Sequence, residues 1–304
     1  MTPPNLRKWQ RRTLVANLVA QTGIVLTGAT VRLTASGLGC PTWPECVAGS
    51  IAPTSQQTEA FHKYIEFGNR LLTFVLLLVA IASLFAVFRH NRERVHAGFI
   101  KRPSLTVMAI GIFAGIFFQA VLGGITVLTG LNPLIVAAHF IVSIGLITVA
   151  TRLLVKAQEP DDRPVVAQVS KPIQIGLLIH IWLAFSVIVL GTLVTGSGPH
   201  AGDTNDIVRL GFDFKNITTA HAAIVWLFVG LTSGLLVALH ATNSPKHVIK
   251  QAWFVFGICM AQGVVGYVQF FSGLPWGLVA LHVLGACLLW IFSVRLYLAR
   301  NLRG

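Results

Sequence analysis

Residues 262–282 read QGVVGYVQFFSGLPWGLVALH, and the chain carries an earlier version of this stretch at residues 119–139, QAVLGGITVLTGLNPLIVAAH. Glutamine, glycine, a Gly-Leu pair and histidine recur at the same offsets, and both copies are mostly apolar. An internal repeat of this kind predicts structurally equivalent units within one chain.

The composition is typical of an integral membrane protein. Of the 304 residues, 54% are hydrophobic and only 11% are charged, whereas about a quarter are charged in soluble domains. A bilayer-spanning helix needs about 20 mostly apolar residues. Eight such runs occur, at residues 14–34, 68–88, 104–128, 133–154, 173–195, 217–240, 250–271 and 276–297. We therefore predict an all-α membrane protein with eight transmembrane helices, and the first run is too long for a removed signal peptide.

The basic residues sort by membrane side. A net charge of +13 would suit a nucleic-acid-binding protein, but 18 of the 23 lysines and arginines lie at span ends on the side that carries both termini. Cytoplasmic loops carry such an excess. The pattern argues against nucleic acid and predicts a multi-pass plasma-membrane protein with both termini in the cytoplasm.

The repeat extends over four spans. GTLVTGSG at residues 191–198 echoes GATVRLTASG at residues 28–37. The polar stretch at 156–172 is a natural linker between an N-terminal half, 1–155, and a C-terminal half, 173–304. Because both halves begin on the same side, we expect two four-helix bundles related by a pseudo-twofold axis along the membrane normal.

The four cysteines are of two kinds. Cys259 and Cys287 fall inside spans, where a cysteine usually packs as a small hydrophobic residue. Cys40 and Cys46 flank PTWPE in the first outer loop, in an oxidising compartment where a disulfide can persist. We expect these two to form a disulfide bond.

Two of the ten histidines, His221 and His282, lie at equal depth near the outer ends of their spans. Neutral imidazoles at equal depth on neighbouring bundle helices can supply both axial ligands to a haem iron. The small residues around them leave room for a flat macrocycle, but they are equally typical of close helix packing. Zinc is less well supported, because no third zinc-ligating side chain occurs at that depth. We predict a haem site in the second half, towards the outer side.

The first half departs from this pattern. His139 corresponds to His282, but Asn69 stands where the second histidine is expected. Glu66, one turn from Asn69, has no acidic counterpart in the second half. Ionisable groups at membrane depth are costly and indicate function, although Glu66 and Arg70 are also spaced as an ordinary i,i+4 ion pair. We predict a closed bis-histidine site in the second half and an open, reactive site in the first.

Five short motifs follow one another at fixed places: GLGCPTWPEC after the first span, EFGNR in the second, VAAHF in the fourth, TTAHAA in the sixth and VALHV in the eighth. Each is weak alone, but their order and spacing resemble the haem A synthase family over nearly the whole chain. That family comprises membrane oxidoreductases that convert the C8 methyl group of haem O to the formyl group of haem A for aa3-type oxidases. The resemblance implies haem O as the substrate and haem A as the product.

The resemblance also implies roles for individual residues. His221 and His282 would hold a haem b that passes electrons, and His139 would bind the iron of the substrate haem. Glu66 would be the catalytic carboxylate, which positions the reacting methyl group, stabilises positive charge or accepts a proton.

Asn69, Arg70 and Arg32 complete the predicted substrate pocket. Asn69 takes the place of the family's histidine, which puts six-coordinate binding of the substrate haem in doubt. The two arginines are expected to pair with haem propionates, because guanidinium matches carboxylate geometry; anchoring at the membrane interface is the alternative. The cysteines of the first outer loop match the family's pair, and the loop at 196–216 lacks the second pair of some relatives.

The lipid bilayer is the partner that the composition itself indicates. The resemblance adds a haem O synthase, cytochrome oxidase assembly factors and an electron donor that the sequence does not identify, and a homo-oligomer is compatible with it. Three other interpretations stay open: a quinol-linked di-haem b cytochrome, which predicts four matched histidines and is disfavoured by Asn69; an inactive homologue; and a haem-free transporter built of parallel repeats.

Overall fold

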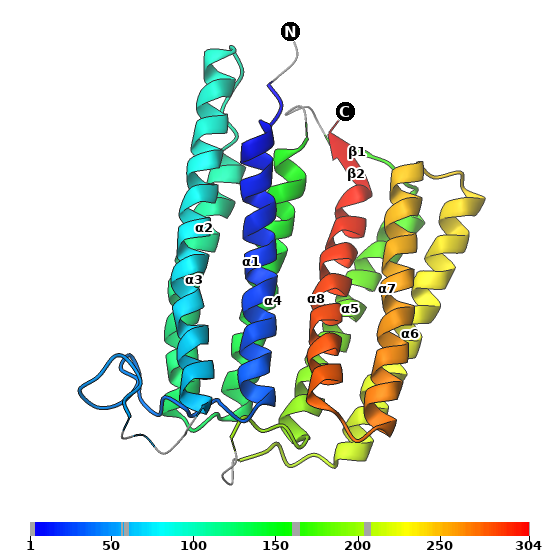
Figure 1. The fold of residues 1–304 in the computed structure, drawn as a ribbon. Coiled ribbons are helices and arrows are strands. Elements are labelled where there is room, and N and C mark those ends of the chain that lie inside the picture. Colours follow the sequence, from blue (N-terminus) through cyan, green and yellow to red (C-terminus); the bar gives the residue numbers. More distant parts are fainter. Residues whose placement is uncertain (1–3, 56, 58–60, 160–164, 204–207, 304) are drawn as a thin grey trace.

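The computed structural model describes residues 4–55, 57, 61–159, 165–203 and 208–303. Parts of the predicted linker and of the loop at 196–216, namely 160–164 and 204–207, lie outside the described residues. The described residues form eight long helices that run side by side (Figure 1). Each helix is long and apolar enough to cross a membrane. The helices are α1 (Lys8–Leu33), α2 (His62–His96), α3 (Pro103–Leu128), α4 (Pro133–Ala157), α5 (Lys171–Ser197), α6 (Phe214–Ala241), α7 (Lys246–Phe271) and α8 (Trp276–Ala299). The prediction of a nearly all-α membrane protein with eight spans is confirmed.

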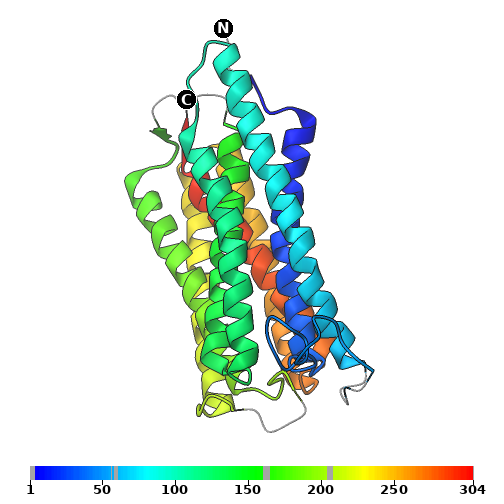
Figure 2. The same cartoon turned by 90° about the vertical axis from the view of Figure 1, so that its left-hand side faces the viewer.

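The helices form two groups of four. In the first group α1 and α3 each pack against both α2 and α4, and in the second α5 and α7 each pack against both α6 and α8. The groups meet through α1, α4, α5 and α8. Both termini lie at one end of the bundle, called here the terminal face, and the loop after α1 lies at the other end, the disulfide face (Figures 1 and 2).

The Gly-Leu pair of the repeat forms the same turn in both halves. Leu131 after α3 and Leu274 after α7 adopt left-handed backbone conformations, with φ of 59° and 60°. Each closes its helix with a backbone hydrogen bond, from Leu131 to Thr126 at 2.8 Å and from Leu274 to Gln269 at 2.7 Å. A left-handed leucine is uncommon, so its occurrence at both positions shows that the copies fold alike.

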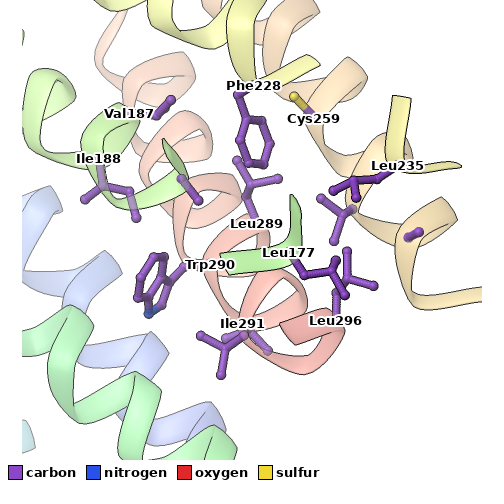
Figure 3. Close-up of a cluster of buried hydrophobic side chains, with 14 of the residues drawn as sticks. Leu177, Val187, Ile188, Phe228, Leu235, Cys259, Leu289, Trp290, Ile291 and Leu296 are labelled. Carbon is purple, nitrogen blue, oxygen red and sulfur yellow. The ribbon is translucent and has the colours of Figure 1, made fainter. Parts of the chain in front are cut away.

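The buried apolar side chains form two clusters, one within the first half and a larger one that is centred on the second half and includes residues of α1 and α4. In the second half, Leu177, Phe228 and Leu289 belong to a large buried cluster (Figure 3). Trp290 lies at the edge of this cluster, and its indole nitrogen donates a hydrogen bond of 2.7 Å to Thr148 of α4. The halves are therefore joined by a specific polar contact as well as by apolar packing.

Two features of the fold were not predicted. A short antiparallel pair joins β1 (Val165–Ala167) in the linker to β2 (Asn301–Arg303) at the C-terminus. Helix α2 has 35 residues, or about 52 Å at 1.5 Å per residue, and so exceeds the roughly 30 Å apolar core of a bilayer. Hydropathy locates only its apolar centre, whereas backbone hydrogen bonding continues into polar residues at both ends.

Candidate functional site

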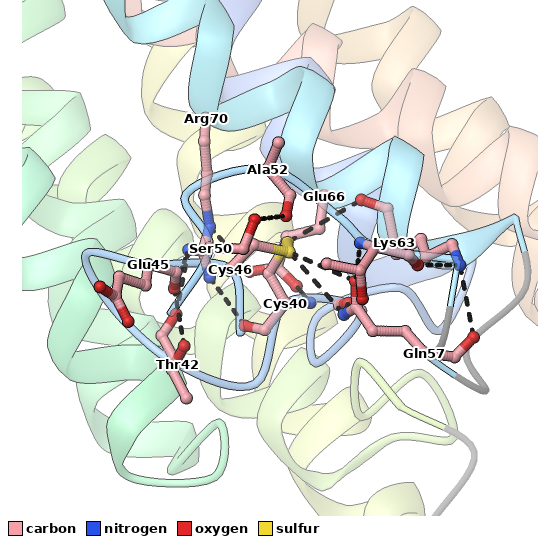
Figure 4. Close-up of a disulfide and its surroundings, with 12 residues drawn as sticks. Cys40, Thr42, Glu45, Cys46, Ser50, Ala52, Gln57, Lys63, Glu66 and Arg70 are labelled. Atoms are coloured by element: carbon pink, nitrogen blue, oxygen red, sulfur yellow. Dashed lines mark hydrogen bonds and ion pairs between the residues drawn. A yellow bond between two sulfur atoms is a disulfide. The ribbon is translucent and has the colours of Figure 1, made fainter. Parts of the chain in front are cut away.

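The loop after α1 folds back on the start of α2 at the disulfide face (Figure 4). The predicted disulfide between Cys40 and Cys46 is confirmed, and both cysteines are fully buried. Gln57 donates from its side-chain amide to the carbonyl of Gly39 at 3.0 Å, and the buried Lys63 ammonium donates to the carbonyl of Thr54 at 2.8 Å. These bonds hold the loop against α2.

Glu66 lies beneath this loop and is only 5% exposed. One carboxylate oxygen, Oε2, accepts a hydrogen bond of 2.7 Å from the backbone N–H of Cys40. The other, Oε1, accepts from Nη2 and Nε of Arg70 at 2.6 and 3.2 Å. The i,i+4 ion pair is therefore present, but the carboxylate also has a donor from the disulfide loop that the sequence pattern could not indicate.

The two arginines predicted near the substrate bind backbone carbonyls. Arg70 donates to the carbonyls of Cys40 at 2.8 Å and Thr42 at 3.0 Å, so it ties Glu66 to the disulfide loop. Arg32 donates from Nε to the carbonyl of His200 at 2.8 Å and from Nη2 to that of Thr195 at 3.1 Å. Arg32 thus fastens α1 to the end of α5 and to the loop between α5 and α6. The pairing of either arginine with a haem propionate stays a prediction.

The three predicted iron ligands and Asn69, which takes the place of the fourth, share one depth. His139 and His282 each lie six residues after the first residue of α4 and α8, and Asn69 and His221 each lie seven residues after the first residue of α2 and α6. At 1.5 Å per residue this is about 9 to 10 Å from the helix ends at the disulfide face. Within the described residues α2 does not pack directly on α4, nor α6 on α8. Each pair therefore lies on diagonal helices of its bundle.

Each of these positions also faces a glycine on the preceding helix. A Cβ atom added to that glycine would meet the ligand side chain at 3.3 to 3.9 Å. The pairs are Gly28 with Asn69, Gly123 with His139, Gly191 with His221 and Gly266 with His282. A Cβ atom would already be in van der Waals contact at these glycines, so a larger side chain would compete with the ring or amide for space. The fourfold recurrence indicates that the positions are structurally equivalent.

The histidines of these pairs leave polar atoms without partners. His139 and His282 have buried Nδ1 atoms, and neither ring makes a hydrogen bond within the described part of the chain. The backbone carbonyl of Val187 faces the imidazole ring of His221. That ring lies close enough to His282 for the two imidazoles to interact electrostatically. Buried polar atoms are normally satisfied. Unsatisfied imidazoles beside glycines therefore fit axial ligation of a haem iron.

One carboxylate near Glu66 was missed from the sequence. Asp203, in the loop between α5 and α6, lies close enough to Glu66 for the two charges to interact. The loop is positioned by Arg32 on one side and, on the other, by a 2.8 Å hydrogen bond between His200 Nε2 and the carbonyl of Leu274. Offsets within a repeat carry no information about contacts between halves, so no sequence signal could have found it.

No zinc-like cluster competes with this interpretation where the chain is described. Within those ranges, no three His, Cys, Asp or Glu side chains come together as a metal site would require. His180, buried at mid-helix in α5, pairs instead with Thr232 of α6 at 3.1 Å.

Comparisons with known proteins identify the family. The family model described as COX15-CtaA, cytochrome oxidase assembly protein, matches residues 11–294. A heme A synthase of Geobacillus thermodenitrificans is 33% identical over 147 residues, which is 47% of this chain and 41% of that protein. One of Lysinibacillus sphaericus is 36% identical over 146 residues, 46% of this chain and 41% of that protein. One of Bacillus pumilus is 25% identical over 275 residues, 85% and 84% of the two chains.

The match with the first two of these relatives spans less than half of their length, whereas the family model covers nearly the whole chain. Since the resemblance seen in the motifs is confirmed by this match and by the eight-helix fold, the chain belongs to the COX15-CtaA family of cytochrome oxidase assembly proteins, the haem A synthase family.

Proposed function

We propose that this chain is a haem A synthase, which oxidises the C8 methyl group of haem O to a formyl group through hydroxylated intermediates. The observation that carries the proposal is the asymmetry between the two diagonal pairs. His221 and His282 face two glycines in the second half, whereas His139 and Asn69 face two in the first. Among the described residues, only the first half adds a buried carboxylate, that of Glu66.

In the second half, His221 and His282 would hold a haem b. When bound, that haem would supply one-electron transfer, which is the chemistry of a bis-imidazole iron. Gly191 and Gly266 place only backbone beside the Cε1 edges of the two rings.

In the first half, His139 would bind the iron of the substrate haem O, and Asn69 would leave the facing side open. The carboxylate of Glu66 is fixed by Arg70 and by the amide of Cys40. A carboxylate oxygen has two lone-pair sites, so Oε2 of Glu66 retains one while it accepts from Cys40. That lone pair can accept a proton released as the methyl group is oxidised to the hydroxylated form, and the negative charge of Glu66 stabilises positive charge that develops on that edge during the oxidation.

The proposal includes an orientation and a division of the chain. The terminal face lies in the cytoplasm and the disulfide face, with both haem sites, lies on the outer side. Residues 1–155 carry the substrate site, 156–172 connect the halves, and 173–304 carry haem b. The excess of basic residues near the terminal face supports this orientation. A haem O synthase and oxidase assembly factors are the proposed partners, together with an unidentified electron donor.

The test is product formation in cells that make haem O but lack haem A. Membranes from cells expressing the chain are extracted, and the pigments are separated into haem O, its hydroxylated form and haem A. We expect haem A with the chain and haem O alone without it. Unchanged haem O in membranes that contain the folded chain would refute the proposal.

The glycine beside His282 provides a test of the haem b site. In Gly266→Val, the new Cβ atom would lie 3.4 Å from Cε1 of His282, and the two methyl groups would crowd the ring further. We expect a severalfold drop in haem b per chain. Gly263→Val is the matched control, because a Cβ at Gly263 meets nothing within 4 Å and the substitution has the same helix propensity. Haem content is measured from the pyridine haemochrome spectrum; equal loss in both variants would count against the site.

A second substitution tests the open side of the substrate haem. Asn69→His would restore a histidine at the position equivalent to His221. We expect the substrate haem to become six-coordinate and low-spin in the absorption spectrum, because two imidazoles then face its iron. An unchanged spectrum would show that Asn69 does not face that iron.

A further inference from the structure

A basic cavity opens at the terminal face, far from the predicted haem sites. It has a volume of about 630 Å³ and lies between the start of α1 and the end of α2. Its charged lining consists of Arg7, Arg89, Arg92, Glu93 and His96. Three guanidiniums face one carboxylate, so the cavity is positively charged.

The single carboxylate is already occupied. Oε1 of Glu93 pairs with Nε of Arg7 and with Nε of Arg89, both at 3.1 Å. Oε2 accepts a hydrogen bond of 3.3 Å from the buried Gln10. Glu93 therefore orders the two guanidiniums side by side rather than competing with an incoming anion.

The outer nitrogens of the guanidiniums stay available. In the described ranges, the Nη atoms of Arg7, Arg89 and Arg92 have no hydrogen-bond partner. Arg92 makes one long contact of 3.4 Å from Nε to His96. Guanidinium donors in fixed positions match the oxygens of a phosphate group.

An apolar strip continues from the cavity towards the middle of the helices. Phe85 lies one turn before Arg89 on the same face of α2 and is 62% exposed. Its ring centroid lies 6.1 Å from that of Trp9, which is itself 39% exposed. Ile81 and Leu78 extend the strip, and both are exposed. One face of α2 thus passes within a single turn from apolar side chains to a guanidinium whose Nη atoms have no hydrogen-bond partner in the described ranges.

We propose that this cavity binds the phosphate headgroup of an anionic phospholipid, whose acyl chains lie along Phe85 and Trp9. The charge of the cavity selects an anion, and the apolar strip selects a lipid over free phosphate. Basic residues beside a span attract anionic lipids. Here the carboxylate of Glu93 fixes the geometry, so the structure assigns a defined site rather than diffuse attraction.

The test measures lipid binding to the full-length protein in detergent by native mass spectrometry. The probes are phosphatidylglycerol, phosphatidylcholine and, as headgroup alone, glycerophosphoglycerol. We expect tighter binding of phosphatidylglycerol than of phosphatidylcholine, and no competition from the water-soluble headgroup. Removing each guanidinium should weaken binding about fivefold, which corresponds to about 1 kcal/mol per charge near the surface.

The variants are Arg92→Gln, which breaks only the contact to His96, and Arg89→Gln/Arg92→Gln. The matched control is Arg11→Gln/Arg12→Gln, which removes two exposed charges from the same end of α1 outside the cavity. Loss of the lipid preference in the cavity variants alone supports the site. Equal loss in the control, full competition by the headgroup, or equal binding of both lipids would overturn it.

Discussion

Replacing Glu66 by glutamine is expected to lower the conversion of haem O to haem A by about a hundredfold or more, the usual contribution of a positioned acid or base. The amide has one acceptor oxygen instead of two, so it can keep the bond from Cys40 or from Arg70 but not both. Arg70 keeps its own bonds to the carbonyls of Cys40 and Thr42, so the disulfide loop should stay in place. The amide carries no negative charge and accepts no proton. The measurement is the rate at which haem O is lost in membranes, with haem b quantified in the same samples.

Glu45→Gln is the matched control for this substitution. Glu45 lies in the same loop, and its side chain caps the backbone N–H of Gly49 at 2.9 Å on the exposed surface. We expect it to keep its conversion rate. Full activity of Glu66→Gln, or equal loss in both variants, would mean that the carboxylate of Glu66 has only the structural role of an ion pair.

Replacing His282 by alanine is expected to remove nearly all haem b and, with it, haem A formation. The imidazole has no hydrogen-bond partner in the described chain, so its loss breaks no internal bond. Loss of pigment would then report loss of an axial ligand rather than loss of folding. The measurement is the ratio of haem b to protein, with thermal unfolding as the check on folding.

His180→Ala provides the contrast within the same half. His180 is buried and bonded to Thr232, so its removal should lower the unfolding temperature while haem b stays bound. If His282→Ala kept its haem b, or if His180→Ala lost as much, the assignment of His282 as a ligand would be wrong.

The sequence predicted the parts of this molecule that depend on residue spacing along one element. Offsets along the chain predict that His139 and His282 share a depth, and that the Gly-Leu pair and the glycines of the two copies occupy equivalent places. The reason is that residue spacing along a helix sets both the depth of a side chain and the face on which it lies. The structure adds that His139, His221, His282 and Asn69 each face a glycine, a contact between helices that the offsets did not predict.

The contacts between elements could not be predicted. The amide of Cys40 that binds Glu66, and the bonds of Arg70 to the disulfide loop, depend on how an irregular loop folds back. Arg32 reaches the carbonyl of His200 in the other half, 168 residues away. Loops carry no periodicity, so hydropathy and spacing leave such partners undetermined.

The most direct test of the proposed division of labour is the identity of the pigments in one purified preparation. The wild-type chain is isolated from cells that also express a haem O synthase, and its haems are extracted and counted per chain. Our proposal predicts one haem b together with haem O or haem A. Two haem b groups per chain, with neither haem O nor haem A, would contradict it and indicate an electron-transfer cytochrome.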